Sequence, residues 1–221
     1  MTHPLHDQVG TLLTFLARQP LTTAVAELER ALEGANCESV AEVAHNFGVD
    51  ADLVRAAVLT RRGLGRINDL IHATAIVKLL PDLLEPGESV HGRPSLAAGN
   101  DPGRRYDLET NLRVAEFKFA EWKGSDAMRM RGVFKDLVHL AAHDDDRRPE
   151  LYIIGERPLK FLANSTSTAS WALDRAKRSR LMFEEKFGPL TMTVAEFTRG
   201  PASHVKLIKL DDLLPALAAL E

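Results

Sequence analysis

The chain has very little cysteine, since only Cys37 among its 221 residues carries a thiol. A single thiol excludes an intrachain disulfide framework and a thiolate zinc cluster. Long apolar runs are also missing, because no stretch approaches the roughly 18 uninterrupted apolar residues that a membrane span needs. Residues 1–10 lack the apolar centre of a signal peptide. These absences predict a cytoplasmic protein that does not bind a membrane.

Three common catalytic signatures are missing as well. The sequence contains no Gly-x-Gly-x-x-Gly and no P-loop, which argues against a nucleotide cofactor or an ATP-driven motor. It contains no Gly-x-Ser-x-Gly elbow, so a serine hydrolase of that kind is unsupported. Any catalytic residues are therefore expected in a different pattern.

Charge is unevenly distributed, although the net charge is only -3. Residues 1–60 carry three basic and eight acidic side chains, which leaves 25 basic and 23 acidic side chains for residues 61–221. A surface that binds phosphate groups is therefore expected beyond residue 60.

Residues 1–62 are predicted to form a helical region. Apolar side chains recur at helical spacing from Val9 to Leu16 and again from Leu21 to Leu32. Pro20 suits the first turn of the second helix, where its missing N–H costs little. The composition therefore favours several short amphipathic helices.

A helix-turn-helix is one interpretation of the end of this region. Ala44, Gly48 and Val54 have the required spacing, and Val54 would lie on the buried face of the second helix. That helix offers Arg55 but also two acidic residues, so base contacts are disfavoured. The favoured interpretation is a helical module for interaction or dimerisation.

Residues 63–221 are predicted to form one α/β domain. A helix is expected at 64–80, ended by Pro81, and its inward face is predicted to carry Ile67, Leu70, Ile71, Ala75 and Leu79. Strands are expected at 88–92, 104–109, 112–119, 151–154, 190–196 and 204–208, and further helices at 128–142, 158–162, 170–187 and 211–220. The order from residue 65 is helix, strand, strand, strand, helix, strand, which predicts one sheet between helices.

Two neighbouring strands carry the most informative residues. In the second strand, Glu116 and Lys118 alternate with Phe117, which is predicted to face the helix at 128–142 while the two charged side chains occupy the opposite face. A tight turn centred on Thr110 and Asn111 would place Asp107 diagonal to Glu116, at a separation of roughly 7–8 Å. Two carboxylates on one face can bind one hard divalent cation through oxygen. A neighbouring lysine can position or deprotonate a water and offset charge in a phosphoryl transition state.

Asp107 followed by Glu116-Phe117-Lys118, a helix and an apolar strand resembles the PD-(D/E)XK nuclease superfamily over about residues 65–155. Tyr106 stands where the name-giving proline would be. The resemblance implies a restriction-endonuclease-like α-β-β-β-α-β sandwich and a Mg²⁺- or Mn²⁺-dependent nuclease. It implies that Asp107 and Glu116 bind the metal, that Lys118 is the motif lysine, and that Asp69 is the candidate for an additional acid from the preceding helix.

Basic residues near the motif are candidates for nucleic-acid contacts. Lys123, Arg129, Arg131 and Lys135 follow it in the sequence, and such cations could bind backbone phosphates. An ordinary charged helix surface is the alternative for each of them. DNA is the expected substrate, although RNA stays open, and so does a homodimer or a protein partner bound by the N-terminal helices. The alternative function is a non-catalytic DNA- or protein-binding regulator on an inactive nuclease-like scaffold.

Overall fold

The computed structural model describes residues 4–33, 36–91, 94–96, 105–120, 122 and 126–215. The chain divides into two compact units, residues 1–67 and residues 68–221. The division predicted from the sequence lay between residues 62 and 63. The first unit is helical in its described part and the second is an α/β unit.

The described residues of the first unit form four helices, α1 (Pro4–Leu16), α2 (Leu21–Leu32), α3 (Cys37–Phe47) and α4 (Ala51–Leu64). Helix α1 packs against α4, and α2 contacts α3. Many large apolar side chains of these helices are exposed, among them Leu13, Leu21, Val25, Val54 and Val58. The amphipathic helices predicted for this region are present, but their apolar stripes are only partly buried.

The turn between α3 and α4 has part of the predicted helix-turn-helix geometry. Gly48 adopts a left-handed backbone with φ of 66°, and the Asp50 side chain caps α4 by accepting a hydrogen bond from the Leu53 N–H. Val54, however, is 58% exposed. The prediction that Val54 packs inward is therefore wrong, since α4 turns its buried face to α1 instead.

The second unit is built on a four-stranded sheet in the order β1-β2-β3-β4. Its strands are β1 (Leu108–Glu109), β2 (Arg113–Lys118), β3 (Arg148–Ile153) and β4 (Lys206–Lys209). Strands β1 and β2 are antiparallel, whereas β2, β3 and β4 run parallel. The sheet is therefore mixed, and the predicted α/β class with a helical N-terminal region is confirmed.

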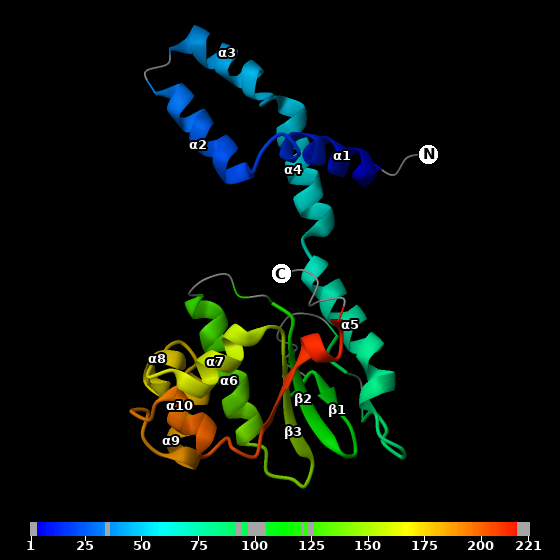
Figure 1. Cartoon of the computed structure of the whole chain (residues 1–221), viewed down its shortest axis with the longest axis vertical. Coiled ribbons are helices and arrows are strands. Elements are labelled where there is room, and N and C mark those ends of the chain that lie inside the picture. The colour runs from blue at the N-terminus through cyan, green and yellow to red at the C-terminus, as the bar shows by residue number, and fades with distance from the viewer. Residues whose placement is uncertain are drawn as a thin grey trace. The chain divides into compact units, whose positions relative to one another are not determined.

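Helices cover both faces of this sheet (Figure 1). Helix α5 (Ile67–Leu83) covers one face, where Ile76 and Leu79 pack with residues of β1, β2 and β3. The other face is covered by α6 (Ala127–Ala141), whose Phe134 and Leu137 belong to a larger core. That core also receives residues of α7 (Glu156–Asn164), α8 (Ala169–Ala172), α9 (Lys177–Phe187) and α10 (Val194–Arg199).

Two predicted strands are wrong. Of the strand predicted at 88–92, the described residues 88–91 contribute an isolated bridge between Val90 and Thr110 instead of a strand, and Gly92 lies outside the described residues. Residues 190–196 lead into helix α10, which starts with a capping box in which Thr193 and Glu196 each satisfy the other's backbone N–H. This capping box favours the start of a helix more strongly than the alternation of apolar residues favours a strand.

The C-terminal helices also differ from the prediction. The helix expected at 170–187 is split into α8 and α9, and the described part of the helix expected at 211–220 begins with a short 3-10 turn, η1 (Leu210–Asp212). Residues 216–221 lie outside the described residues.

The two faces of β2 are interchanged relative to the prediction. Ala115 and Phe117 pack with α5, while Val114 belongs to the core under α6. Glu116 and Lys118 alternate with Phe117 and therefore share the α6 face. Alternation along the strand separated the two sets correctly, but it could not say which helix would cover which set.

Helix α5 also buries a different face from the predicted one. His72, Ile76, Leu79 and Leu83 are buried, and the helix continues through Pro81 to Leu83, whereas Leu70 is 57% exposed. Apolar residues occur all around this helix, so its periodicity did not single out the inward face.

A buried ion network lies on the α5 side of the sheet. The Arg113 guanidinium donates hydrogen bonds of 2.6 Å to both carboxylate oxygens of Glu88 and of 3.0 Å to Glu150 Oε2. It also donates to the Leu83 carbonyl and the Tyr152 hydroxyl. The network connects the end of α5 to β2 and β3 and thereby holds the loop after α5 against the sheet.

Candidate active site

The β1–β2 hairpin brings the predicted carboxylates together. Leu108 pairs with Ala115 and Glu109 with Val114, so continuing this register places Asp107 opposite Glu116. The turn is centred one position later than predicted, because the Thr110 N–H donates to the Arg113 carbonyl at 2.9 Å. The two acids lie close enough for their side chains to share a hydrogen bond.

Asp107 is held in place by two donors. Its Oδ2 accepts a 2.9 Å hydrogen bond from the Phe117 N–H and lies 3.3 Å from His72 Nε2. The other ring nitrogen of His72 lies 3.2 Å from the Leu96 carbonyl oxygen. Burial would raise the pKa of Asp107, but the hydrogen bond from His72, the nearby charge of Lys118 and the Phe117 N–H outweigh it and lower the pKa. Asp107 is therefore an oriented, ionised carboxylate.

Glu116 has the opposite electrostatic character. Burial and the negative charges of Asp136 and Asp107 raise its pKa well above the usual value, and it shares a side-chain hydrogen bond with Asp107. One of two facing carboxylates keeps a proton more readily because two adjacent negative charges repel each other. A cation placed between Asp107 and Glu116 would remove this repulsion.

Lys118 lies between two carboxylates. Its Nζ is 3.5 Å from Glu116 Oε2 and 2.7 Å from Asp136 Oδ2 on α6. Burial would lower the pKa of Lys118, but the charges of Asp136, Glu116 and Asp107 outweigh it and raise the pKa. The side chain is 32% exposed, so a fully charged ammonium is accessible from solvent beside the acidic pair.

The donor set suits a hard divalent cation only with help from other ligands. Asp107 and Glu116 supply carboxylate oxygens, and Mg²⁺ commonly uses one or two carboxylates together with water and substrate phosphate. Within the described part of the chain, no group of three or more His, Cys, Asp or Glu side chains is arranged to hold a metal. The α5 side chain that hydrogen-bonds Asp107 is that of His72, three residues after Asp69, and a metal-binding role for Asp69 stays a prediction.

The basic residues predicted to contact nucleic acid do not form one cluster among the described residues. Lys135 Nζ lies 3.9 Å from Asp136 Oδ1, and Asp136 is also the carboxylate that contacts Lys118. Arg129 pairs with Asp126, the residue that caps α6. Arg131 pairs with Asp174 at 3.6 Å and lies over the ring of Trp171. Lys123 lies outside the described residues.

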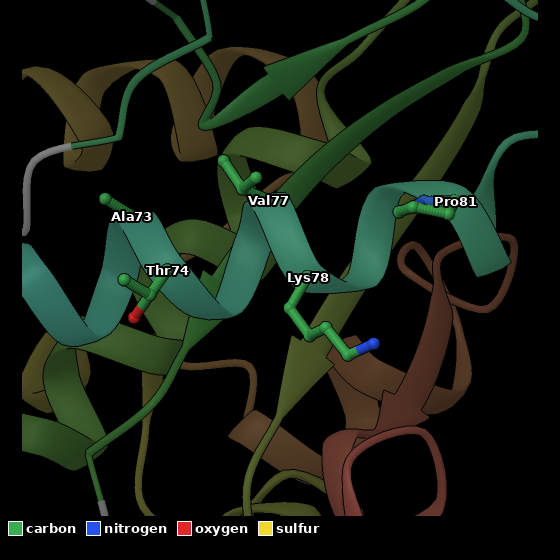
Figure 2. A pocket seen from close by; sticks show the side chains of 5 residues that line it. All are labelled: Ala73, Thr74, Val77, Lys78 and Pro81. Carbon is green, nitrogen blue, oxygen red and sulfur yellow. The ribbon is translucent and has the colours of Figure 1, made fainter.

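A shallow pocket occurs elsewhere on the second unit. It has a volume of about 480 Å³ and is lined by Ala73, Thr74, Val77, Lys78 and Pro81. Figure 2 shows that these side chains all come from α5. None of them belongs to the predicted site, so this pocket is not formed by the carboxylates or Lys118.

Comparison of the chain with family models, curated proteins and solved structures gives no significant match. In the portion of the chain described by the structure, no helix has both the length and the apolar character to cross a membrane. The functional argument therefore depends on the residues themselves.

Two residues of the site escaped the sequence analysis. Asp136 and His72 are both buried polar residues on the inward faces of helices. Asp136 stands beside the apolar residues Phe134 and Leu137, and a carboxylate within an inward helical face was a usable signal. His72 carried no comparable signal, because the inward face of α5 was itself assigned incorrectly.

Proposed function

We propose that the chain is a metal-dependent nuclease of the restriction-endonuclease-like type that hydrolyses phosphodiester bonds in DNA. The observation that carries this proposal is the meeting of Asp107, Glu116 and Lys118 beside the β1–β2 hairpin. The parallel β2–β3 pair and the helices on both faces of the sheet are compatible with it. Of the α-β-β-β-α-β order, the first strand is the element without support, since the described residues 88–91 contribute an isolated bridge.

Asp107 and Glu116 would hold Mg²⁺ or Mn²⁺. When bound, such an ion supplies charge neutralisation at the phosphate and a more acidic water. Asp107 is ready for this role because the Phe117 N–H and His72 fix one of its oxygens. Glu116 would give up its proton as the cation binds, since metal ligands must be deprotonated.

Lys118 would act as an ammonium. Its raised pKa favours hydrogen bonding to a phosphate oxygen and offsetting of transition-state charge over removal of a proton from water. Lys135 lies next to Asp136 and would add a second positive charge for the nucleic-acid backbone.

The test is incubation of the pure protein with supercoiled plasmid and with single-stranded DNA, with and without Mg²⁺ or Mn²⁺. We expect metal-dependent cleavage by the wild type and none by the Asp107→Ala, Lys118→Ala double variant. The matched control replaces an exposed acid and an exposed lysine that are not among the proposed site residues, Asp52→Ala with Lys206→Ala, and should keep full activity. Equal cleavage by all three proteins would identify a contaminant and refute the proposal.

A non-catalytic regulator on a nuclease-like scaffold is the second candidate. Two observations favour it: the absence of a three-residue metal group within the described residues, and the many exposed apolar side chains of α1–α4 that could bind a partner or a second copy. Calorimetry with Mn²⁺ separates the candidates. The nuclease should bind Mn²⁺ and lose this binding in Asp107→Ala, whereas a scaffold should bind no Mn²⁺ even with DNA present.

A further inference from the structure

Asp136 is a buried carboxylate that none of the proposed steps uses. It lies in the middle of α6 between residues of the core, and only 9% of its surface is exposed. Its Oδ2 is 2.7 Å from Lys118 Nζ, a shorter separation than the 3.5 Å between Lys118 and Glu116. Asp136 is therefore the nearer of the two acids that hold the ammonium.

A carboxylate at this position contributes little to stability by itself. Burying a charge is costly, and replacing a buried ion pair with apolar residues is often neutral or stabilising. The neighbours Val133, Phe134 and Leu137 are all fully or almost fully buried, so an apolar side chain would fit the pattern of the helix. Stability therefore does not explain the carboxylate, and its contact with Lys118 is the remaining basis for a role.

Lys118 needs such a partner because its side chain is long and flexible. An unrestrained lysine distributes its ammonium over many rotamers and loses side-chain entropy when one of them is selected. Asp136 projects from a packed helix, whereas Glu116 is on the same strand as Lys118. Two carboxylates on different elements define the position of the ammonium better than one.

We propose that Asp136 is a positioning residue that holds the Lys118 ammonium beside the Asp107–Glu116 pair and acts only through Lys118. This inference rests on the proposed nuclease function. It differs from a role for Asp136 as a metal ligand, which would act without Lys118.

The test is a double-mutant cycle of Asp136→Asn, Lys118→Met and the combination, measured as kcat and KM for DNA cleavage. Asp136→Asn keeps the size of the side chain and removes its charge. We expect kcat to fall by about 10- to 100-fold, the usual effect of losing a supporting contact, with KM and the Mn²⁺ dissociation constant little changed. In the Lys118→Met background, Asp136→Asn should cause no further loss. Asp136→Glu should restore part of kcat because it keeps the carboxylate.

The matched control is Glu156→Gln. Glu156 forms a 2.9 Å ion pair with Lys209 outside the site, so this variant also removes an acid from a lysine pair and should cleave like the wild type. An equal loss from Asp136→Asn in both backgrounds, or loss of Mn²⁺ binding, would overturn the proposal and identify an independent role. Unchanged kcat in Asp136→Asn would overturn it as well.

Thermal unfolding of the wild type, Asp136→Asn, Lys118→Met and the double variant, without DNA or metal, separates this inference from the proposed function. Non-additive changes in Tm are expected if Lys118 and Asp136 are paired in solution, and additive changes would overturn the pairing. If the pairing is found but the wild type cleaves no DNA with either metal, the proposed function fails and the positioning role fails with it. If the wild type cleaves DNA and the changes are additive, only the positioning role fails.

Discussion

Replacement of Arg113 by methionine should destabilise the second unit strongly. The side chain of Arg113 is 5% exposed, and those of its partners Glu88 and Glu150 are 0% and 2% exposed. The substitution keeps an apolar stem of similar length but takes the guanidinium away from both carboxylates, and Glu150 keeps a 3.9 Å contact with Arg148. Removing one partner of a buried ion pair costs about 3–5 kcal/mol. For a chain of this size, each kcal/mol lowers Tm by roughly 2–4 °C, so a loss of about 6–20 °C is expected at neutral pH.

The pH dependence of stability tests the electrostatic origin of this loss. Burial would raise the pKa of Glu88, but hydrogen bonds from Arg113, Thr110 and the backbone outweigh it and lower the pKa from 4.5 to about 2. A depressed pKa in the folded state means that the stabilisation is complete above pH 4.5 and is lost as pH falls toward 2. The shift corresponds to about 3 kcal/mol, an order-of-magnitude figure, since one pKa unit is about 1.4 kcal/mol.

In Arg113→Met, the ionised form of Glu88 should destabilise the folded state instead of stabilising it. Without the guanidinium, burial favours the protonated form of Glu88, so lowering the pH from 6 to 4 should narrow the stability gap between variant and wild type. Urea unfolding at several pH values, followed by far-UV circular dichroism, measures both curves. Lys209→Met is the control, because it removes the cation of an ion pair outside the network, in which the Glu156 side chain is 55% exposed. A gap between Arg113→Met and wild type that stays constant with pH would refute the electrostatic reasoning, and a loss below about 1 kcal/mol would refute the importance of the network.

Two further predictions concern the site. Glu116→Gln should abolish metal-dependent cleavage yet stabilise the metal-free protein at pH 8, by on the order of 1 kcal/mol, since it removes a buried charge whose raised pKa makes ionisation costly as pH rises. Thermal unfolding in chelator checks this, and a lower Tm for the variant would contradict it. Neutralising Arg129 and Lys135 together as glutamines should weaken DNA binding and reduce the slope of log affinity against log salt by about 1 to 2, because each phosphate contact releases a counterion. Fluorescence anisotropy at several salt concentrations measures this slope, and an unchanged slope would show that these cations do not contact phosphate.

The charges around Lys118 support the proposal that the site takes up a cation. Asp107, Glu116 and Asp136 are three acids within one cluster, and the described partners that offset them are Lys118, Lys135 and His72. Burial, together with the negative charges of Asp136 and Asp107, keeps the pKa of Glu116 raised in spite of these partners. Mn²⁺ binding measured against pH is therefore informative, since affinity should rise with pH as Glu116 loses its proton.

Local patterns in the sequence determined much of the fold. The alternation of Glu116, Phe117 and Lys118 identified β2, and the helical spacing after Met128 identified α6. Both signals are strong because side-chain direction follows directly from the backbone period of a strand or helix. The helical first region and the residues Asp107, Glu116 and Lys118 as one cluster follow from the same local information.

Only the tertiary structure decided which helix covers which face of β2, which face of α5 is buried, and that Asp136 and His72 join the site. Alternation and helical periodicity sort residues into faces but contain no information about what packs against each face. A helix such as α5, which is apolar all around, leaves the choice to contacts with residues distant in the sequence. The ion pair between Lys118 and Asp136 depends on that choice, because it forms only when α6 covers the charged face of β2.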